Sequence, residues 1–134
     1  MNRKTARENA FILLFELSSK TDEGAEEIFE KATGIRELQC DSFVKKLFFG
    51  VNENLRVIDE CIDKCLKGWK RERISIVTTA LLRLAVYELM FCEDTPHKVI
   101  INEAIELSKK YDDDNTYKFV NGVLNLAAED CGRK

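Results

Sequence analysis

The chain has 134 residues, of which 45% are hydrophobic, and a formal net charge of −3 at pH 7. This length can bury one core but not two, so we expect a single domain over residues 1–134. We expect a cytoplasmic protein with no membrane partner, because no run of about 18 apolar residues could span a bilayer and no signal-peptide pattern follows the basic start. The negative charge excludes a surface that is basic throughout, so any site for a polyanion must be local.

The residues that usually carry catalysis or bind metals form no recognisable site. The five cysteines lack CxxC spacing, and the single His97 cannot complete a zinc set with them. Cys61 and Cys65 share a helix face, and reduced thiols in the core are the simplest interpretation of the pair. Residues 112–114 are a run of three aspartates without the alternation or the glycine of a calcium loop, so they indicate a solvated turn. We therefore predict no enzyme, no catalytic residue, no metal and no cofactor.

The first half of the chain has the spacing of apolar residues that is typical of amphipathic helices. One proline and six glycines leave long runs of good helix formers. Residues 5–8 have the pattern of a capping box, which predicts that a helix begins at Thr5 and continues to Ser18. A short acidic helix is expected over residues 25–31. The helical period continues over residues 43–66, where Gly50 is interpreted as a break between two helices.

The second half contains the most apolar segment. Residues 74–91 are apolar on nearly all sides, which predicts a central, buried helix. Thr95 and Pro96 then have the order of an N-cap followed by a proline in the first helical position. After the aspartate turn, Asn115 or Thr116 can cap a last helix. The expected fold is an all-α, compact bundle of about seven helices.

We expect these helices to form two packed halves, at about residues 1–67 and 68–134. Arg83 and Glu88 place charges on the central apolar helix, and buried charges are usually paired. A structural network between Arg83 and a glutamate of a neighbouring helix is therefore predicted. Gly122 interrupts the last helix at a cost of about 1 kcal/mol relative to alanine, so close packing against its backbone is expected.

Three basic residues lie at the start of the first helix, namely Arg3, Lys4 and Arg7. Cations at the positive end of a helix dipole do not stabilise the helix, but an anion bound there would be favoured. Phosphate is the natural anion. A solvated basic terminus without a ligand is the alternative interpretation.

A second candidate for nucleic-acid binding is the start of the last helix. Lys118 lies between Tyr117 and Phe119, which offers a charge for a phosphate and aromatic faces for unpaired bases. Such stacking contributes about 1–3 kcal/mol per base. Phe119 is also in helical phase with Val123, so a place in the core is the alternative for this residue.

Five short motifs occur in a fixed order along the chain: Ala6-Arg7-Glu8, Gly50-Val51, LRLAVYEL at 82–89, INEAIEL at 101–107 and KFVNGVL at 118–124. In this order and spacing the chain resembles the NusB family of bacterial transcription antitermination factors over almost its whole length. The resemblance implies an all-α fold in two helical halves. It also implies a partner, NusE (ribosomal protein S ten), with which the protein holds single-stranded boxA RNA of nascent ribosomal transcripts near RNA polymerase.

The resemblance assigns residues to two surfaces. The surface that meets RNA comprises Arg3, Lys4, Arg7, Asn115, Thr116, Lys118 and Phe119. The surface that meets NusE comprises Phe15, Thr78, Thr79 and Leu82. Thr78 departs from the family, which often has an acidic residue there, and the Arg3-Lys4-Thr5 arm replaces a richer arginine run.

Two other functions are compatible with the sequence. The chain could be a helical protein–protein scaffold in which the basic start has no role. It could also be an accessory domain for an RNA-modifying enzyme, because NusB-like domains occur fused to RNA cytosine methyltransferases. The choice between a monomer and a homodimer stays open.

Overall fold

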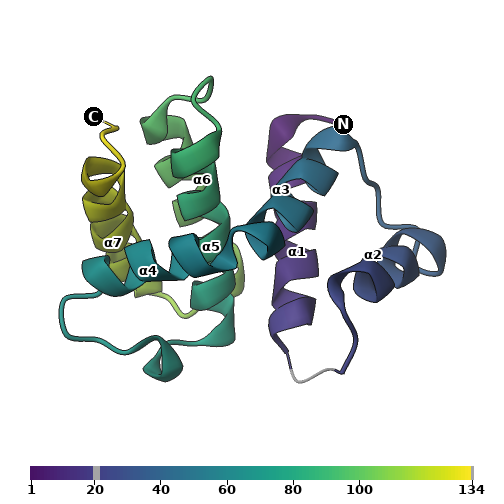
Figure 1. The fold of residues 1–134 in the computed structure, drawn as a ribbon, viewed down its shortest axis with the longest axis horizontal. Helices are drawn as coiled ribbons and strands as arrows, with labels where there is room; N and C mark the ends of the chain where they lie inside the picture. The colour runs from purple at the N-terminus through teal and green to yellow at the C-terminus, as the bar shows by residue number, and fades with distance from the viewer. Residues whose placement is uncertain (20–21, 134) are drawn as a thin grey trace.

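The computed structural model describes residues 1–19 and 22–133, and Lys20, Thr21 and Lys134 lie outside that part. Within it the chain forms seven α-helices, one short 3₁₀ helix and no strand (Figure 1), so the all-α prediction is confirmed. The helices are α1 Arg3–Ser18, α2 Ala25–Gly34, α3 Ser42–Glu53, α4 Leu55–Cys65, η1 Arg71–Arg73, α5 Ile76–Phe91, α6 His97–Tyr111 and α7 Thr116–Asp130.

Helix α1 begins two residues earlier than predicted. The side chain of Asn2 is the N-cap, and its Oδ1 accepts a hydrogen bond of 2.8 Å from the backbone N–H of Thr5. Thr5 therefore lies in the first turn, and the predicted capping box does not form. Glu8 does not reach back to the backbone, because its carboxylate accepts hydrogen bonds from Lys110 and Tyr111 of α6.

The break between α3 and α4 falls at Asn54, and not at Gly50 as predicted. The backbone N–H of Asn54 donates to the carbonyl oxygens of Gly50 and Val51 at 3.1 and 3.2 Å. Its side-chain amide donates to the Gly50 carbonyl at 2.8 Å, which ends α3. Gly50 lies inside α3, where a Cβ atom would overlap the ring of Tyr87 on α5. The glycine permits close approach of two helices and does not break either of them.

Gly122 on α7 shows the opposite situation. It is exposed, and an added Cβ atom would meet nothing within 4 Å. The predicted close packing against its backbone is therefore wrong. The lone proline also differs slightly from prediction, because Pro96 occupies the N-cap position of α6 and His97 is the first helical residue.

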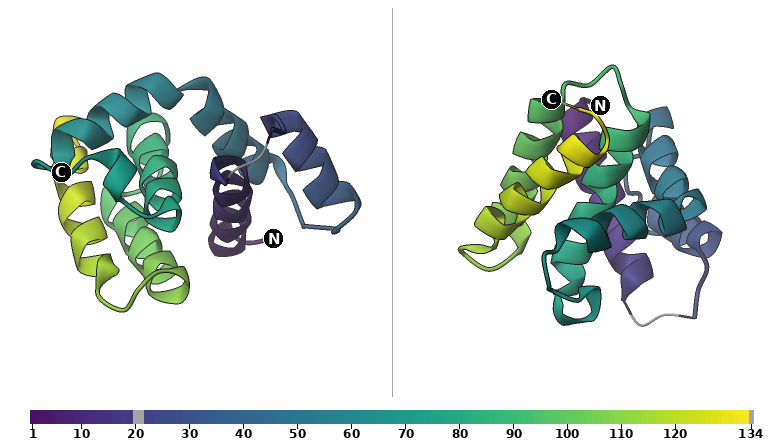
Figure 2. Two further views of the ribbon diagram at one scale, coloured as in Figure 1. Left: turned by 90° about the horizontal axis from the view of Figure 1, so that it is seen from below. Right: turned by 60° about the vertical axis from the view of Figure 1, so that its left-hand side comes forward.

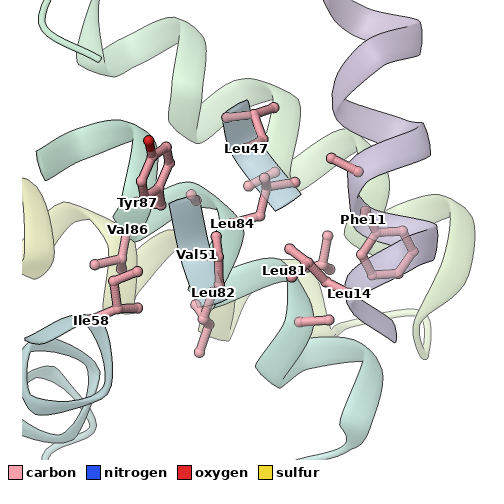
Figure 3. Close-up of a cluster of buried hydrophobic side chains, with 14 of the residues drawn as sticks. Phe11, Leu14, Leu47, Val51, Ile58, Leu81, Leu82, Leu84, Val86 and Tyr87 are labelled. Atoms are coloured by element: carbon pink, nitrogen blue, oxygen red, sulfur yellow. The ribbon is translucent and has the colours of Figure 1, made fainter. Parts of the chain in front are cut away.

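Helix α5 is the central helix, as predicted. Its N-cap Ser75 accepts a hydrogen bond of 3.1 Å from the backbone N–H of Thr78. The helix then packs against α1, α3, α4, α6 and α7. Figure 3 shows side chains from α1, α3, α4 and α5 in one cluster, including Phe11, Val51, Ile58 and Leu82. Full burial of each large apolar side chain of this kind contributes about 1.5–3 kcal/mol.

Helices α3 and α4 lie end to end and pack against different neighbours. Helices α3 and α4 follow one another as an arc across the molecule, with α1 and α2 beside one end (Figure 2). Helix α4 packs against α5 and α7, and its buried side chains Ile58, Cys61, Ile62 and Cys65 face that half. The packing of α4 on α5 and α7 thus brings the last helix of the first part of the chain onto helices of the second part.

All five cysteines are free thiols, and Cys61, Cys65 and Cys92 are buried. Burial raises the pKa of each of these three thiols. In the part of the chain that the structure describes, no group of three or more His, Cys, Asp or Glu side chains could hold a metal ion. No helix of that part has the length and apolar character needed to cross a membrane.

Candidate nucleic-acid interface

Arg7 is part of a buried ion pair between two helices. Only 5% of the residue is exposed. Its Nε donates to both carboxylate oxygens of Glu88 on α5, at 3.0 and 2.9 Å. Burial raises the pKa of the Glu88 carboxyl, and the hydrogen bonds from Arg7 oppose that rise. Of the three basic residues predicted to meet RNA, Arg7 thus has its guanidinium committed to the protein interior.

The other two basic residues at the start of α1 are exposed. The guanidinium of Arg3 lies over the ring of Phe43 on α3, with Cζ 3.7 Å from the ring centroid. This cation–π contact holds Arg3 against α3, and the residue remains exposed. Lys4 lines a groove of about 310 Å³ between α1 and α6, whose charged lining mixes lysines with glutamates, namely Lys109, Lys110, Glu8, Glu103 and Glu106. Arg3 and Lys4 can therefore still meet a phosphate.

The start of α7 presents its predicted residues at the surface. Lys118 is exposed, and Thr116 and Phe119 are half-buried. Asn115 holds the N-cap position, but its side chain makes no capping hydrogen bond. The Phe119 ring lies edge-on to Trp69, with ring centroids 6.0 Å apart. The sequence permits two interpretations of Phe119, as a core residue or as a stacking surface for bases. The residue has both positions, because it packs against the core and also lines an open groove.

The two predicted groups do not lie side by side. Helix α1 begins near the end of the bundle where α7 ends, so the start of α1 and the start of α7 are at opposite ends (Figure 1). The last turn of α6 connects them. Lys110 donates to Glu8 of α1, and the Lys109 ammonium lies 4.8 Å from the ring centroid of Tyr117 on α7. The candidate surface is thus a path from Lys4 along the end of α6 to α7.

Sequence reasoning missed Lys109 and Lys110. Two lysines in the last turn of a helix are normally explained by the negative end of the helix dipole, and that explanation hides any further role. The hydrogen bonds that Glu8 accepts from Lys110 and Tyr111 lower the pKa of the Glu8 carboxyl. They join α1 to α6 at the middle of the path.

The residues predicted to meet a partner protein divide into exposed and buried ones. Phe15 is 36% exposed, and Thr79 is half-buried. Leu82 is fully buried in the core, as Figure 3 shows, and only 2% of Thr78 is exposed. The helical turn that contains Thr79 also brings Ile76 to the surface, where it is 43% exposed.

Thr78 has a structural partner in place of an exposed side chain. Its hydroxyl donates to the carboxylate of Asp112, in the turn between α6 and α7. An acidic group is therefore present beside position 78 even though the residue itself is a threonine. The aspartate run is a turn, as predicted, and one of its carboxylates is bound to α5.

The predicted charge network on α5 exists with different partners. Arg83 donates through Nε and Nη2 to the carboxylate of Asp59 on α4, at 3.0 Å each. Arg71 shares Asp59 at 3.0 Å and binds Asp63 at 2.6 Å. Arg83 is thus paired with an aspartate, and Glu88 with Arg7. The structural nature of the network is as predicted, and the predicted glutamate partner for Arg83 is wrong.

Comparison with known proteins covers nearly the whole chain. The model of the NusB family matches residues 4–129. The transcription antitermination protein NusB of Clostridium botulinum is 45% identical over 129 residues, covering 93% of this chain and 96% of that protein. The protein of the same name from Bacillus cereus is 44% identical over 125 residues, covering 93% of this chain and 95% of its own length.

The fold of the chain is also similar to solved structures of NusB proteins. A structure of T. maritima NusB superposes with a TM-score of 0.85 at 38% identity, covering 96% of this chain and 92% of that one. A crystal structure of the antitermination factors NusB and NusE in complex with dsRNA gives a TM-score of 0.84 at 29% identity, covering 96% of both chains.

Proposed function

The chain belongs to the NusB family, and on that premise we propose that it is a transcription antitermination factor that binds RNA together with NusE. The observation that carries the proposal is similarity over nearly the full length to a protein solved with NusE and RNA. The proposed RNA is a single-stranded, boxA-type element of nascent ribosomal transcripts. The factor would hold it in the antitermination complex on RNA polymerase in the cytoplasm.

The described surface supports binding of a single strand. Lys4, Lys109 and Lys118 are exposed and offer charges to phosphates along the path defined above, whereas Lys110 is paired with Glu8. Tyr117 and Phe119 offer ring faces or edges to unpaired bases. The net charge of the chain is −3, so these few cations bind weakly alone, and a partner protein must add to the RNA surface. No step of this function requires a catalytic group, and we propose no enzymatic activity.

Arg7 has a different role in this proposal from that of Arg3 and Lys4. Its ion pair with Glu88 joins α1 to α5 and positions the start of α1. We assign phosphate contacts at this end to Arg3 and Lys4, which are exposed. Arg7 acts through the position of the helix and not through contact with RNA.

The proposed surface for NusE consists of Phe15, Ile76 and Thr79, which are exposed or half-buried at the end of α1 and the start of α5. Exposed large apolar side chains such as Phe15 and Ile76 are typical of an interface core. Ile76 and Thr79 line a groove whose charged residues are Arg71, Glu72 and Arg83. Thr78 and Leu82 are buried, so they pack behind this surface and do not contact the partner directly.

Binding of a fluorescent single-stranded boxA-like RNA, with and without NusE at several salt concentrations, tests the proposal. The informative variant is Lys109→Glu/Lys118→Glu. Loss of two phosphate contacts should reduce the slope of log affinity against log salt by about 1.4, since each contact to a single strand contributes about 0.7. The matched control is Lys45→Glu/Arg56→Glu, which makes the same charge change on exposed parts of α3 and α4.

We expect the control to retain partner-enhanced binding with the salt slope of the wild type, and the Lys109→Glu/Lys118→Glu variant to bind RNA more weakly with a slope reduced by about 1.4. Equal losses in both variants would assign the effect to net charge alone. NusE binding without any contribution from RNA contact would instead support a protein scaffold.

A further inference from the structure

Trp69 is a large aromatic residue that the fold leaves open to solvent. It lies in the loop between α4 and α5, and 60% of the residue is exposed. Its ring meets Phe119 edge-on, with an interplanar angle of 70°. An exposed tryptophan beside a second aromatic residue is unusual for a surface that only faces water.

The loop that carries Trp69 is held in place from both sides. The backbone N–H of Trp69 donates to the backbone carbonyl of Leu66 at the end of α4, at 3.2 Å. Arg71, two residues later, is bound to Asp59 and Asp63 of α4. The indole is therefore presented by an anchored segment, so little conformational entropy would be lost when a ligand stacks on it.

Trp69 and Phe119 line one groove of about 410 Å³ together with Arg73, Ile74, Asp113 and Thr116. We call it the Trp69 groove. Its volume lies in the range typical of sites for small ligands or single residues of a polymer. Arg73 is exposed and, unlike Arg71, has no carboxylate within ion-pair distance among the described residues. The groove thus combines an aromatic wall with an uncommitted cation.

We propose that the Trp69 groove binds one unpaired nucleotide of the RNA, with the base stacked on the indole and a phosphate at the Arg73 guanidinium. This inference rests on the function proposed above, because Thr116 and Phe119 belong both to the groove and to the proposed RNA path. That continuity, together with the complementarity of Arg73 to a phosphate, favours a nucleotide over a peptide segment of a partner.

The acidic side of the groove determines how the nucleotide enters. Asp112 is already bound to Thr78, whereas Asp113 is exposed. A carboxylate repels a phosphate and accepts hydrogen bonds from the exocyclic amino groups of bases. The base edge therefore faces Asp113, and a base that carries an amino group binds better than one that carries a carbonyl at the same position.

Intrinsic fluorescence tests this site directly, because Trp69 is the only tryptophan of the chain. Addition of a labelled single-stranded RNA should quench the emission in parallel with the rise in anisotropy of the label. A matched variant, Trp69→Phe/Ile35→Trp, moves the fluorophore to the C-cap position of α2, which is 82% exposed. It should bind RNA by anisotropy without quenching.

Substitution of Trp69 measures its contribution to affinity. Trp69→Ala should weaken RNA binding roughly 5- to 150-fold, which corresponds to the loss of one stacked base. Trp69→Phe keeps an aromatic ring and should lose less, and Ile35→Ala should bind as the wild type does. Thermal melting of each variant verifies that the fold is retained.

Oligocytidine and oligouridine hexamers test the acidic side, because the two bases differ at one exocyclic group. We expect tighter binding of oligocytidine by the wild type, and loss of that preference in Asp113→Asn. Equal affinities in the wild type would overturn the assignment of Asp113.

The outcomes separate this inference from the proposed function. RNA binding with no quenching and no effect of Trp69→Ala would overturn the Trp69 groove and leave the RNA-binding function intact. Absence of RNA binding, even with NusE, would overturn both. A Trp69→Ala variant that loses affinity for NusE but not for RNA would assign the groove to the protein partner and overturn the proposal.

Discussion

The starts of α1 and α7 differ in what the fold does with similar side chains. Each has basic residues next to aromatic ones in the sequence or in space. At the start of α1, Arg7 is buried against Glu88 and Arg3 lies over Phe43. At the start of α7, Lys118 is exposed and Phe119 borders an open groove. A basic residue near an aromatic one indicates a binding surface only when tertiary packing leaves both available.

The starts of α1 and α7 should also differ in how substitutions change the free energy of unfolding. A buried ion pair adds little net stability relative to apolar residues, but removal of one partner leaves a buried charge uncompensated. The start of α1 should therefore respond to substitution mainly through stability. The start of α7 should respond mainly through affinity for RNA.

The largest expected effect is at the buried pair. Glu88→Ala should lower the free energy of unfolding by about 3–5 kcal/mol, because Arg7 is left buried without a partner. Urea denaturation measures this change. The matched control is Glu60→Ala on α4, whose ion pair with Arg56 is exposed, and whose removal should cost less than about 1 kcal/mol.

A double variant, Arg7→Met/Glu88→Leu, sharpens the test. It removes both charges and keeps apolar volume, so it should recover much of the stability lost in Glu88→Ala. If Glu88→Ala is no less stable than Glu60→Ala, Arg7 is not held by this pair and becomes available to RNA.

The next effect separates the tightly packed centre from the open face of α7. Gly50→Ala should destabilise the protein by about 1–3 kcal/mol, because the new methyl group overlaps the buried Tyr87 ring. Gly122→Ala should stabilise it by about 0.5–1 kcal/mol, because the added Cβ meets nothing and favours the helix. Thermal or chemical unfolding gives both values, and changes of the same sign would contradict the contrast.

A smaller effect concerns the exposed cations at the start of α1. Lys4→Gln should reduce the salt dependence of RNA binding in the presence of NusE by about 0.7 in the log–log slope, which is one phosphate contact. Lys45→Gln on α3 removes the same charge from an exposed site outside the path and should leave the slope unchanged. Equal slopes for Lys4→Gln and the wild type would remove Lys4 from the RNA surface and leave Arg3 as the phosphate contact at this end of α1.

The smallest effect is a pH dependence at the contact between α1 and α6. Hydrogen bonds from Lys110 and Tyr111 lower the pKa of Glu8 below its ordinary value of 4.5. The folded state therefore favours the carboxylate, so this contribution to stability is present above pH 4.5 and is lost as the pH falls from there through the lowered value. Glu8→Gln should flatten the fall in melting temperature over that acidic range. An unchanged profile would show that Glu8 is not tied to α6 in solution.

Much of the fold could be predicted from local patterns. The apolar period along residues 43–66 and the continuous apolar character of residues 74–91 correspond to α3, α4 and the central α5. Helix starts were less predictable. Asn2 and Thr5 are both good caps, and the choice between them depends on Glu8, which binds α6 and is not available for a capping box.

Glycines and charges were the least predictable features. Gly50 and Gly122 both interrupt helical patterns, yet only Gly50 is in close contact with another helix. Arg83 could be assigned a buried partner on general grounds, but Asp59 is 24 residues away and becomes its partner only when α4 packs on α5. Trp69 gave no signal in its own segment, because its neighbour Phe119 is 50 positions later in the chain.

The sequence by itself determined the helical fold, the central helix and the family, because these depend on the period of apolar residues and on motifs within single segments. Tertiary structure alone decided that Arg7 is buried while Lys118 is exposed, that Lys109 and Lys110 connect the ends of the proposed RNA path, and that Trp69 faces Phe119. The physical reason is that burial, ion pairing and groove formation depend on which helix faces pack together.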